Sequence, residues 1–198
     1  MSIITKINQL DFDKKYSYAD YLQWRLDEFV ELVKGRVLKM SPAPLRLHQV
    51  VAGRIFADLE QYLRKKSCNV YIAPFDVRFP RVKDGSDEQI FTVVQPDICI
   101  VCDETKLDDR GCVGAPDTII EILSRGNIDR DVNQKFKLYQ EFGVPEYWIV
   151  APGEKTITAY QLDAAGKYQL SGEYDQDGPI PIASLKDFTL KWEDIFND

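Results

Sequence analysis

Residues 118–123 read Thr118-Ile119-Ile120-Glu121-Ile122-Leu123 and place one carboxylate inside an apolar run. Apolar residues at consecutive positions are typical of a strand in a sheet that is covered on both faces. A carboxylate is costly to bury unpaired, so Glu121 requires a cation, a metal ion or a raised pKa. The run therefore predicts a central strand and a candidate functional residue on it.

The next segment predicts a helix over 129–142 that ends at Gly143, followed by a strand over 146–150. This order predicts a right-handed crossover in a partly parallel sheet. At about 100° per residue, Lys135 lies at the centre of the helix's apolar stripe, which is formed by Val132, Leu138, Tyr139 and Phe142. Lys137 lies about 200° away and faces water.

A lysine that faces the core needs a nearby anion, and Glu121 on the preceding strand is the first candidate. Two interpretations stay open: a structural salt bridge between Lys135 and Glu121, or an active-site ammonium beside a bound metal ion.

Asp97 is a second acid in an apolar context, within the strand-like segment 93–101. Pro96 lacks a backbone donor, so the chain there is a sheet edge, a bulge or the beginning of a strand. Two acids on neighbouring core strands suggest a shared divalent cation, and the alternative is that each makes its own structural hydrogen bond or ion pair.

Two further residues are candidates for the outer part of the same site. His48 lies on the apolar side of a predicted helix over 45–66, where a lone histidine is more often a hydrogen-bonded core residue than a ligand. Glu31 lies in the apolar segment 29–33, and its alternative is an outward-facing edge residue.

The remaining pattern predicts one domain over 1–198 with a core at about 29–160, and it contains no internal repeat or low-complexity linker. The further elements that we expect are a hairpin formed by 29–33 and 36–40 around Lys34-Gly35, strands at 69–72 and 76–79, a hairpin formed by 156–161 and 167–174, and a short helix at 191–196.

Composition narrows the functional classes. The chain has 198 residues and a formal net charge of −7, which argues against coating nucleic acid through bulk charge but not against a local basic groove. It contains neither an apolar stretch of membrane-spanning length nor an apolar segment near Met1 that is typical of a secretory signal, so we expect a cytoplasmic protein. Nucleotide-loop, dinucleotide, serine-hydrolase and zincin motifs are absent.

The expected cytoplasmic location predicts the redox state of the cysteines. Cys68, Cys99, Cys102 and Cys112 are expected to be reduced thiols. Cys99 and Cys102 form a C-x-x-C pair, but no second pair follows at zinc-ribbon spacing, so buried thiols are favoured over a structural zinc site.

Several motifs in order resemble one family. They are Glu31-Leu32-Val33-Lys34-Gly35, Met40-Ser41-Pro42, His48, Gln95-Pro96-Asp97, Glu121-Ile122-Leu123-Ser124, Asp131, Lys135 and Gly143-Val144-Pro145-Glu146-Tyr147-Trp148. From about residue 20 to 160, the chain resembles the large bacterial family of restriction-endonuclease-like proteins in the PD-(D/E)XK nuclease superfamily. The resemblance implies an α/β (α+β) fold with a mixed central sheet flanked by helices, to which the N-terminal and C-terminal hairpins are added.

The resemblance also implies site residues. Asp97 is the motif aspartate and Glu121 the motif glutamate, and with the backbone carbonyl of Ile122 they would bind Mg²⁺, for which Mn²⁺ can substitute. The superfamily lysine two residues after the glutamate is Leu123 here, and Lys135 from the next helix would replace it. Glu31 and His48 match further recurrent positions of the family and are possible auxiliary residues of the site. Where the family often continues Pro-Ser-Thr after Ser124, this chain has Arg125-Gly126-Asn127.

The function that we expect is therefore metal-dependent hydrolysis of DNA phosphodiester bonds by a homodimeric endonuclease. A non-catalytic binding or assembly module with a nuclease fold is one alternative, and a metal-dependent hydrolase of RNA or small phosphate esters is another. Basic residues that could contact a nucleic-acid backbone are Arg46, Arg54, Arg64, Lys65, Lys66, Arg78, Arg81 and Arg125.

Overall fold

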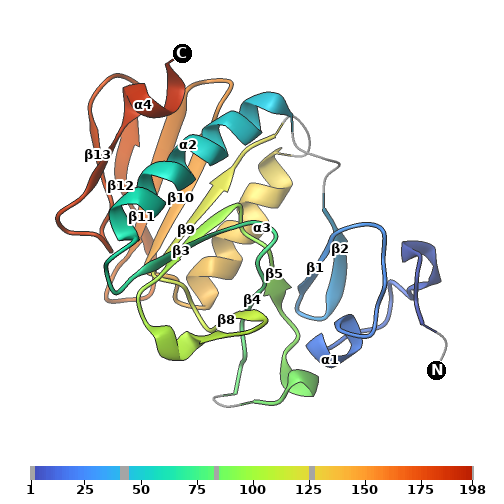
Figure 1. Ribbon diagram of the computed structural model, residues 1–198. Helices are drawn as coiled ribbons and strands as arrows, with labels where there is room; N and C mark the ends of the chain where they lie inside the picture. The colour runs from blue at the N-terminus through green and yellow to red at the C-terminus, as the bar shows by residue number, and fades with distance from the viewer. Residues whose placement is uncertain (1–2, 41–44, 83–84, 125–127, 198) are drawn as a thin grey trace.

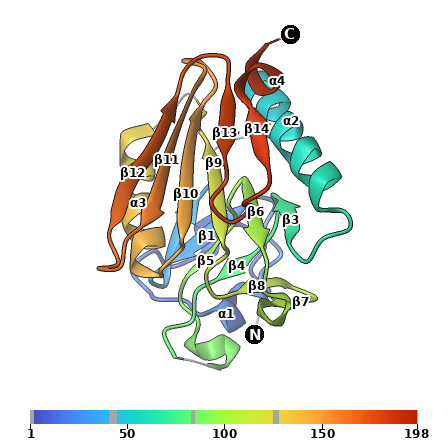
Figure 2. The ribbon, with the colours of Figure 1, turned by 90° about the vertical axis from the view of Figure 1, so that its left-hand side faces the viewer.

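The computed structural model describes residues 3–40, 45–82, 85–124 and 128–197, and for residues 128–131 it describes the backbone alone. In these residues (Figure 1) a central sheet has the strand order β12-β11-β10-β9-β6-β3, which can be followed in Figure 2. Its strands are β3 (Asn69–Ile72), β6 (Ile98–Val101), β9 (Thr118–Ile122), β10 (Glu146–Ala151), β11 (Thr156–Leu162) and β12 (Tyr168–Tyr174).

Helices cover this sheet on both faces. Figure 2 shows α3 (Ile128–Glu141) on one face, and α2 (Arg46–Leu63), α4 (Trp192–Phe196) and the β13–β14 hairpin (Pro179–Pro181 and Thr189–Lys191) on the other. Strand β9 serves both layers, because Ile120 and Ile122 pack with α2 whereas Ile119 packs with α3. All of β9 is buried, as its apolar run predicts.

The sheet is mixed. Strands β9 and β10 are parallel, with Glu121 opposite Ile149, and α3 connects them as expected. The other pairs of this sheet are antiparallel. The expected C-terminal hairpin is present as β11 and β12, and it extends the central sheet from β10. The fold class predicted from the sequence is confirmed.

A second sheet contains the N-terminal hairpin. Its order is β2-β1-β5-β4-β8-β7, and its strands are β1 (Val30–Val33), β2 (Arg36–Lys39), β4 (Val77–Arg78), β5 (Val93–Val94), β7 (Leu107–Asp108) and β8 (Gly111–Val113). Lys34 and Gly35 adopt positive φ values of 53° and 82°, which confirms the predicted turn. Short helices precede the strands or connect them: η1 (Ile7–Gln9), α1 (Tyr18–Tyr21), η2 (Asp87–Gln89) and η3 (Glu104–Lys106).

The segment 93–101, expected as one strand, is two strands in different sheets. β5 pairs with β1 and β4 in the second sheet, and β6 pairs with β3 and β9 in the central sheet. Gln95, Pro96 and Asp97 carry the chain from one sheet to the other. The missing donor of Pro96 therefore marks a change of sheet rather than an irregularity within one strand.

The expectation that the cysteines are reduced is wrong for two of them. Cys68 and Cys102 form a disulfide, whereas Cys99 and Cys112 are free and buried. The antiparallel register pairs Asn69 with Val101, which brings the flanking Cys68 and Cys102 together at one end of the β3–β6 pair. Cys102 is consequently committed to the disulfide, and Cys99-x-x-Cys102 is not a zinc-binding pair. Within the described residues, no helix is long and apolar enough to cross a membrane.

Candidate active site

The Glu121 carboxylate lies under α3 and accepts hydrogen bonds from that helix. Lys135 Nζ lies 2.9 Å from Glu121 Oε1, and the hydroxyl of Tyr139 donates to the same oxygen at 2.6 Å. Glu121 is 8% exposed and Tyr139 is fully buried. Lys135 faces the core as its helical position predicts, whereas Lys137 is exposed.

Glu31 is a second carboxylate for the same lysine. Its Oε1 lies 3.2 Å from Lys135 Nζ and accepts a hydrogen bond of 2.9 Å from the backbone N–H of Gln95. Glu31 is buried and β1 lies between β2 and β5, so the interpretation as an outward-facing edge residue is wrong. The Lys135 ammonium therefore joins an acid of the central sheet to an acid of the second sheet.

Asp97 lies where the chain enters β6, beside the end of β9. Its Oδ2 accepts a hydrogen bond of 2.7 Å from the backbone N–H of Ile122, and its Oδ1 lies 3.3 Å from His48 Nε2. The backbone carbonyl of Asp97 accepts a hydrogen bond from Ala73. His48 is buried on α2, as its position on the apolar face predicts, and it joins the site through Asp97.

Burial and charge shift the pKa values of these groups. Burial raises the pKa of Glu121 to about 7, and the Asp97 and Glu31 carboxylates add to this effect, while Lys135 opposes it. Burial acts to lower the pKa of Lys135, but the charges of Glu121 and Glu31 outweigh burial and raise it. For His48, burial acts to lower the pKa, but hydrogen bonding and attraction to Asp97, with a contribution from the Ile122 backbone, raise it.

The donor set suits a hard divalent cation. Within the described ranges, no group of three or more His, Cys, Asp or Glu side chains could hold a metal ion by itself. Mg²⁺ usually binds through one or two carboxylates and keeps several waters. Asp97 and Glu121 provide such a pair, and the Asp97 side chain contacts the Ile122 backbone directly. The residues therefore fit Mg²⁺ with an incomplete protein shell.

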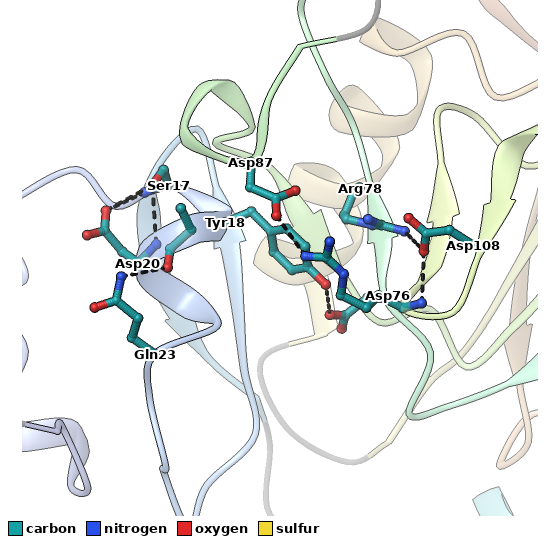
Figure 3. Close-up of polar contacts among 10 residues, drawn as sticks. Ser17, Tyr18, Asp20, Gln23, Asp76, Arg78, Asp87 and Asp108 are labelled. Carbon is teal, nitrogen blue, oxygen red and sulfur yellow. Dashed lines mark hydrogen bonds and ion pairs between the residues drawn. The ribbon is translucent and has the colours of Figure 1, made fainter.

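Sequence reasoning missed several residues around this centre. Tyr139 lies four residues after Lys135 on the same helix face, so its spacing could have placed it near Glu121. Its aromatic ring, however, also fits an ordinary core position. Gln95, in the segment that connects the two sheets, is another of these residues. Its Nε2 donates to Asp76 Oδ1 at 2.8 Å, and its backbone N–H donates to Glu31 Oε1. Tyr18 of α1 donates to the other oxygen of Asp76 at 3.2 Å (Figure 3).

The predicted backbone-contacting basic residues include one clear error. Arg78 is 2% exposed and forms an ion pair with Asp108 (Figure 3), so it is part of the interior of the second sheet. Arg81 is paired with Glu141, and Arg54 donates to the carbonyls of Ile195 and Asn197. Arg125, the loop that follows Ser124, the motif segment after Met40 and the Asp131 side chain lie outside the described part of the chain.

A pocket lies between the end of β1 and α3. Of the residues on α3 that line it, Gln134 precedes Lys135 and the other three follow it, and Val33 lies two residues after Glu31 on β1. Its lining residues are Val33, Lys34, Gln134, Lys137, Leu138 and Glu141. Glu141 is paired with Lys34 and with Arg81. Lys34 and Lys137 line this pocket, whereas Asp97, Glu121, Glu31 and Lys135 do not.

The comparisons with known proteins identify the family and the fold. A family model described as "Uma2: Putative restriction endonuclease" matches residues 18–193. The chain belongs to the Uma2 family. This Uma2 chain is also similar to a crystal structure described as a "putative nuclease belonging to DUF820" from Anabaena variabilis, with 19% identity, a TM-score of 0.69, and coverage of 91% of this chain and 97% of that one. At that identity the likeness shows the fold. No curated protein matches the sequence.

Proposed function

We propose that this protein is a Mg²⁺-dependent endonuclease that hydrolyses DNA phosphodiester bonds. The observation that carries the proposal is the Lys135 ammonium, held by Glu121 and Glu31 beside the Asp97 carboxylate, in a chain of a restriction-endonuclease-like family. A buried cation beside acids in excess is an arrangement that suits charge stabilisation at a phosphate.

Asp97, Glu121 and the backbone carbonyl of Ile122 would hold the metal ion, and Mn²⁺ would substitute for Mg²⁺. When bound, the ion supplies Lewis-acid polarisation of a phosphoryl oxygen and helps to activate water. Hydrolysis joins the oxygen of one water molecule to phosphorus and breaks one phosphodiester P–O bond, leaving a phosphate end and a hydroxyl end.

Lys135 would orient the attacking water or stabilise the charge that develops on phosphorus. Its ion pairs with Glu121 and Glu31 raise its pKa, which favours these cationic roles over proton abstraction by a neutral amine. Glu31 is then an auxiliary residue that holds Lys135 from the second sheet. His48 is an auxiliary residue that holds Asp97.

The substrate's backbone would follow the pocket between β1 and α3. Lys34 and Lys137 lie on this pocket and can contact phosphates that flank the cleaved bond. This local arrangement would compensate for the net charge of −7, because phosphate contacts depend on nearby cations more than on total charge. A homodimer would bring two such sites to the two strands of a duplex.

The test is cleavage of plasmid and single-stranded DNA by the wild type and Asp97→Ala, with Mg²⁺, Mn²⁺ or EDTA. We expect cleavage that requires both the metal and Asp97. Light scattering of the same samples measures the oligomeric state. RNA and a small phosphate diester serve as competing substrates, and preferential hydrolysis of either would replace DNA as the substrate.

A non-catalytic module is the second candidate, and one observation favours it. Each of the two motif acids already has a nitrogen-bearing side chain as partner: Glu121 has Lys135, and Asp97 has His48. Such pairs can be purely structural. Absence of cleavage, together with no Asp97-dependent Mn²⁺ binding in calorimetry, would favour this candidate over the endonuclease.

A further inference from the structure

Tyr139 is buried directly against the proposed metal-binding acid. Its hydroxyl donates to Glu121 Oε1 at 2.6 Å, which is the distance typical of a charge-assisted O–H···O⁻ hydrogen bond. The ring is fully buried, and it packs against Tyr147 with 5.1 Å between ring centroids. Packing fixes the ring, so the direction of the hydroxyl is fixed as well.

Lys135 and Tyr139 use the same carboxylate oxygen. They are four residues apart on α3 and therefore lie on one helix face. Two donors from one rigid helix turn Glu121 Oε1 toward α3, which leaves Oε2 as the oxygen for a metal ion. A carboxylate with only one flexible partner would have no such preferred orientation.

The two donors cannot have equal roles if Lys135 acts on the reacting phosphate. A lysine that moves toward water or phosphate weakens its own contact with Glu121, and the carboxylate then needs another anchor. The Tyr139 hydroxyl is that anchor, because it belongs to a buried ring that cannot follow Lys135.

We propose that Tyr139 is a positioning residue that holds Glu121 in its metal-binding orientation while Lys135 engages the substrate. The expected effect of Tyr139 on DNA cleavage rests on the proposed function. Its expected effect on metal affinity requires only that Asp97 and Glu121 bind a metal ion. Substitution of groups that orient metal ligands typically lowers metal affinity or activity by about 10- to 100-fold.

The test compares Tyr139→Phe with Tyr147→Phe in the full chain. Both variants remove one buried hydroxyl and keep the ring, but among the described residues the Tyr147 hydroxyl has no hydrogen-bond partner. Calorimetry with Mn²⁺ should show a Kd about tenfold higher for Tyr139→Phe and unchanged for Tyr147→Phe. With DNA, Tyr139→Phe should lower kcat about tenfold and leave KM within about twofold.

The readouts separate the two proposals. Equal Mn²⁺ affinity and equal kcat for Tyr139→Phe and the wild type would overturn the role of Tyr139 while leaving the nuclease intact. Asp97-dependent Mn²⁺ binding that weakens in Tyr139→Phe, without DNA cleavage by any variant, would support the role of Tyr139 and overturn the nuclease. Absence of Mn²⁺ binding by the wild type would overturn both. Thermal unfolding in EDTA identifies a Tyr139→Phe sample that is not folded, and Mn²⁺ binding is then compared at a temperature where both variants are folded.

Discussion

Replacing Lys135 with Met should destabilise the protein in a way that depends on pH. Lys135 Nζ is 2.9 Å from Glu121 Oε1 and 3.2 Å from Glu31 Oε1, so these oxygens are at most about 6 Å apart. Without the ammonium, two carboxylates at that distance repel by about 3 kcal/mol at an effective dielectric constant of about 20. Removing one partner of a buried ion pair typically costs about 3–5 kcal/mol. We therefore expect a loss of about 3 kcal/mol at pH 8.

The loss should shrink as the pH falls. In Lys135→Met the pKa of Glu121 in the folded state rises above the value of about 7 that it has beside Lys135, since burial and the Asp97 and Glu31 carboxylates remain while the opposing ammonium is lost. A folded state with the higher pKa binds the proton more tightly, so its stability is present at low pH and is lost as the pH rises. At pH 5 the variant should be close to the wild type.

Urea unfolding in EDTA at pH 5 and pH 8 measures this difference. The control is Lys137→Met, which makes the same change at an exposed position of the same helix and should alter stability by less than about 0.5 kcal/mol at either pH. An equal destabilisation by Lys135→Met at both pH values would refute the electrostatic reasoning, and a loss no larger than that of Lys137→Met would refute the buried ion pairs themselves.

Other predictions concern groups around the site. His48→Gln should destabilise the protein more at pH 5.5 than at pH 8, because Asp97 raises the pKa of His48 and the resulting stability is lost as the pH rises through it; thermal unfolding at both pH values checks this, and a larger loss at pH 8 would contradict it. Lys137→Ala should reduce the slope of log K for DNA against log salt by about 1, and a change no larger than that of exposed Lys167→Ala would exclude Lys137 from the interface. Cys68→Ser should lower stability by up to about 4 kcal/mol, given the sequence separation of 34 residues in the disulfide, and dithiothreitol should then have no further effect on its urea midpoint. Gly111→Ala should destabilise by about 3 kcal/mol or more, because its Cβ would lie 2.2 Å from the Asp76 carbonyl oxygen; Gly114→Ala, also at positive φ but with open space, should cost less in the same measurement.

The residues that break the local pattern were the ones that the sequence identified well. Glu121 interrupts an apolar strand and Lys135 interrupts an apolar helix face. Each can therefore be identified as a candidate from the local sequence, without knowing which residues lie near it in space. The structure confirms that they lie together, with His48 beside Asp97. Their catalytic roles stay predictions.

Features that depend on strand pairing were out of reach. The burial of Glu31 accompanies its contacts with the Gln95 backbone and with Lys135 of α3, which no period in the sequence reveals. The disulfide depends on the register of β3 with β6, and the division of 93–101 depends on a change of sheet at Pro96. Tyr139 was missed for another reason. An aromatic ring on the buried stripe fits the core pattern whether or not its hydroxyl forms a hydrogen bond with a site residue.

The chain passes between the two sheets at Gln95, Pro96 and Asp97. The arrangement of the site residues therefore depends on how the two sheets pack against each other. Gln95 holds Glu31 from the second sheet through its backbone, while Asp97 two residues later holds the end of β9 in the central sheet. A shift of one sheet relative to the other would therefore strain the hydrogen bonds that hold Glu31 and Asp97 in place. Amide exchange at Gln95 and Ile122 should accordingly slow together when a divalent cation binds to Asp97 and Glu121, because the ion would fix the connecting segment 95–97 to β9.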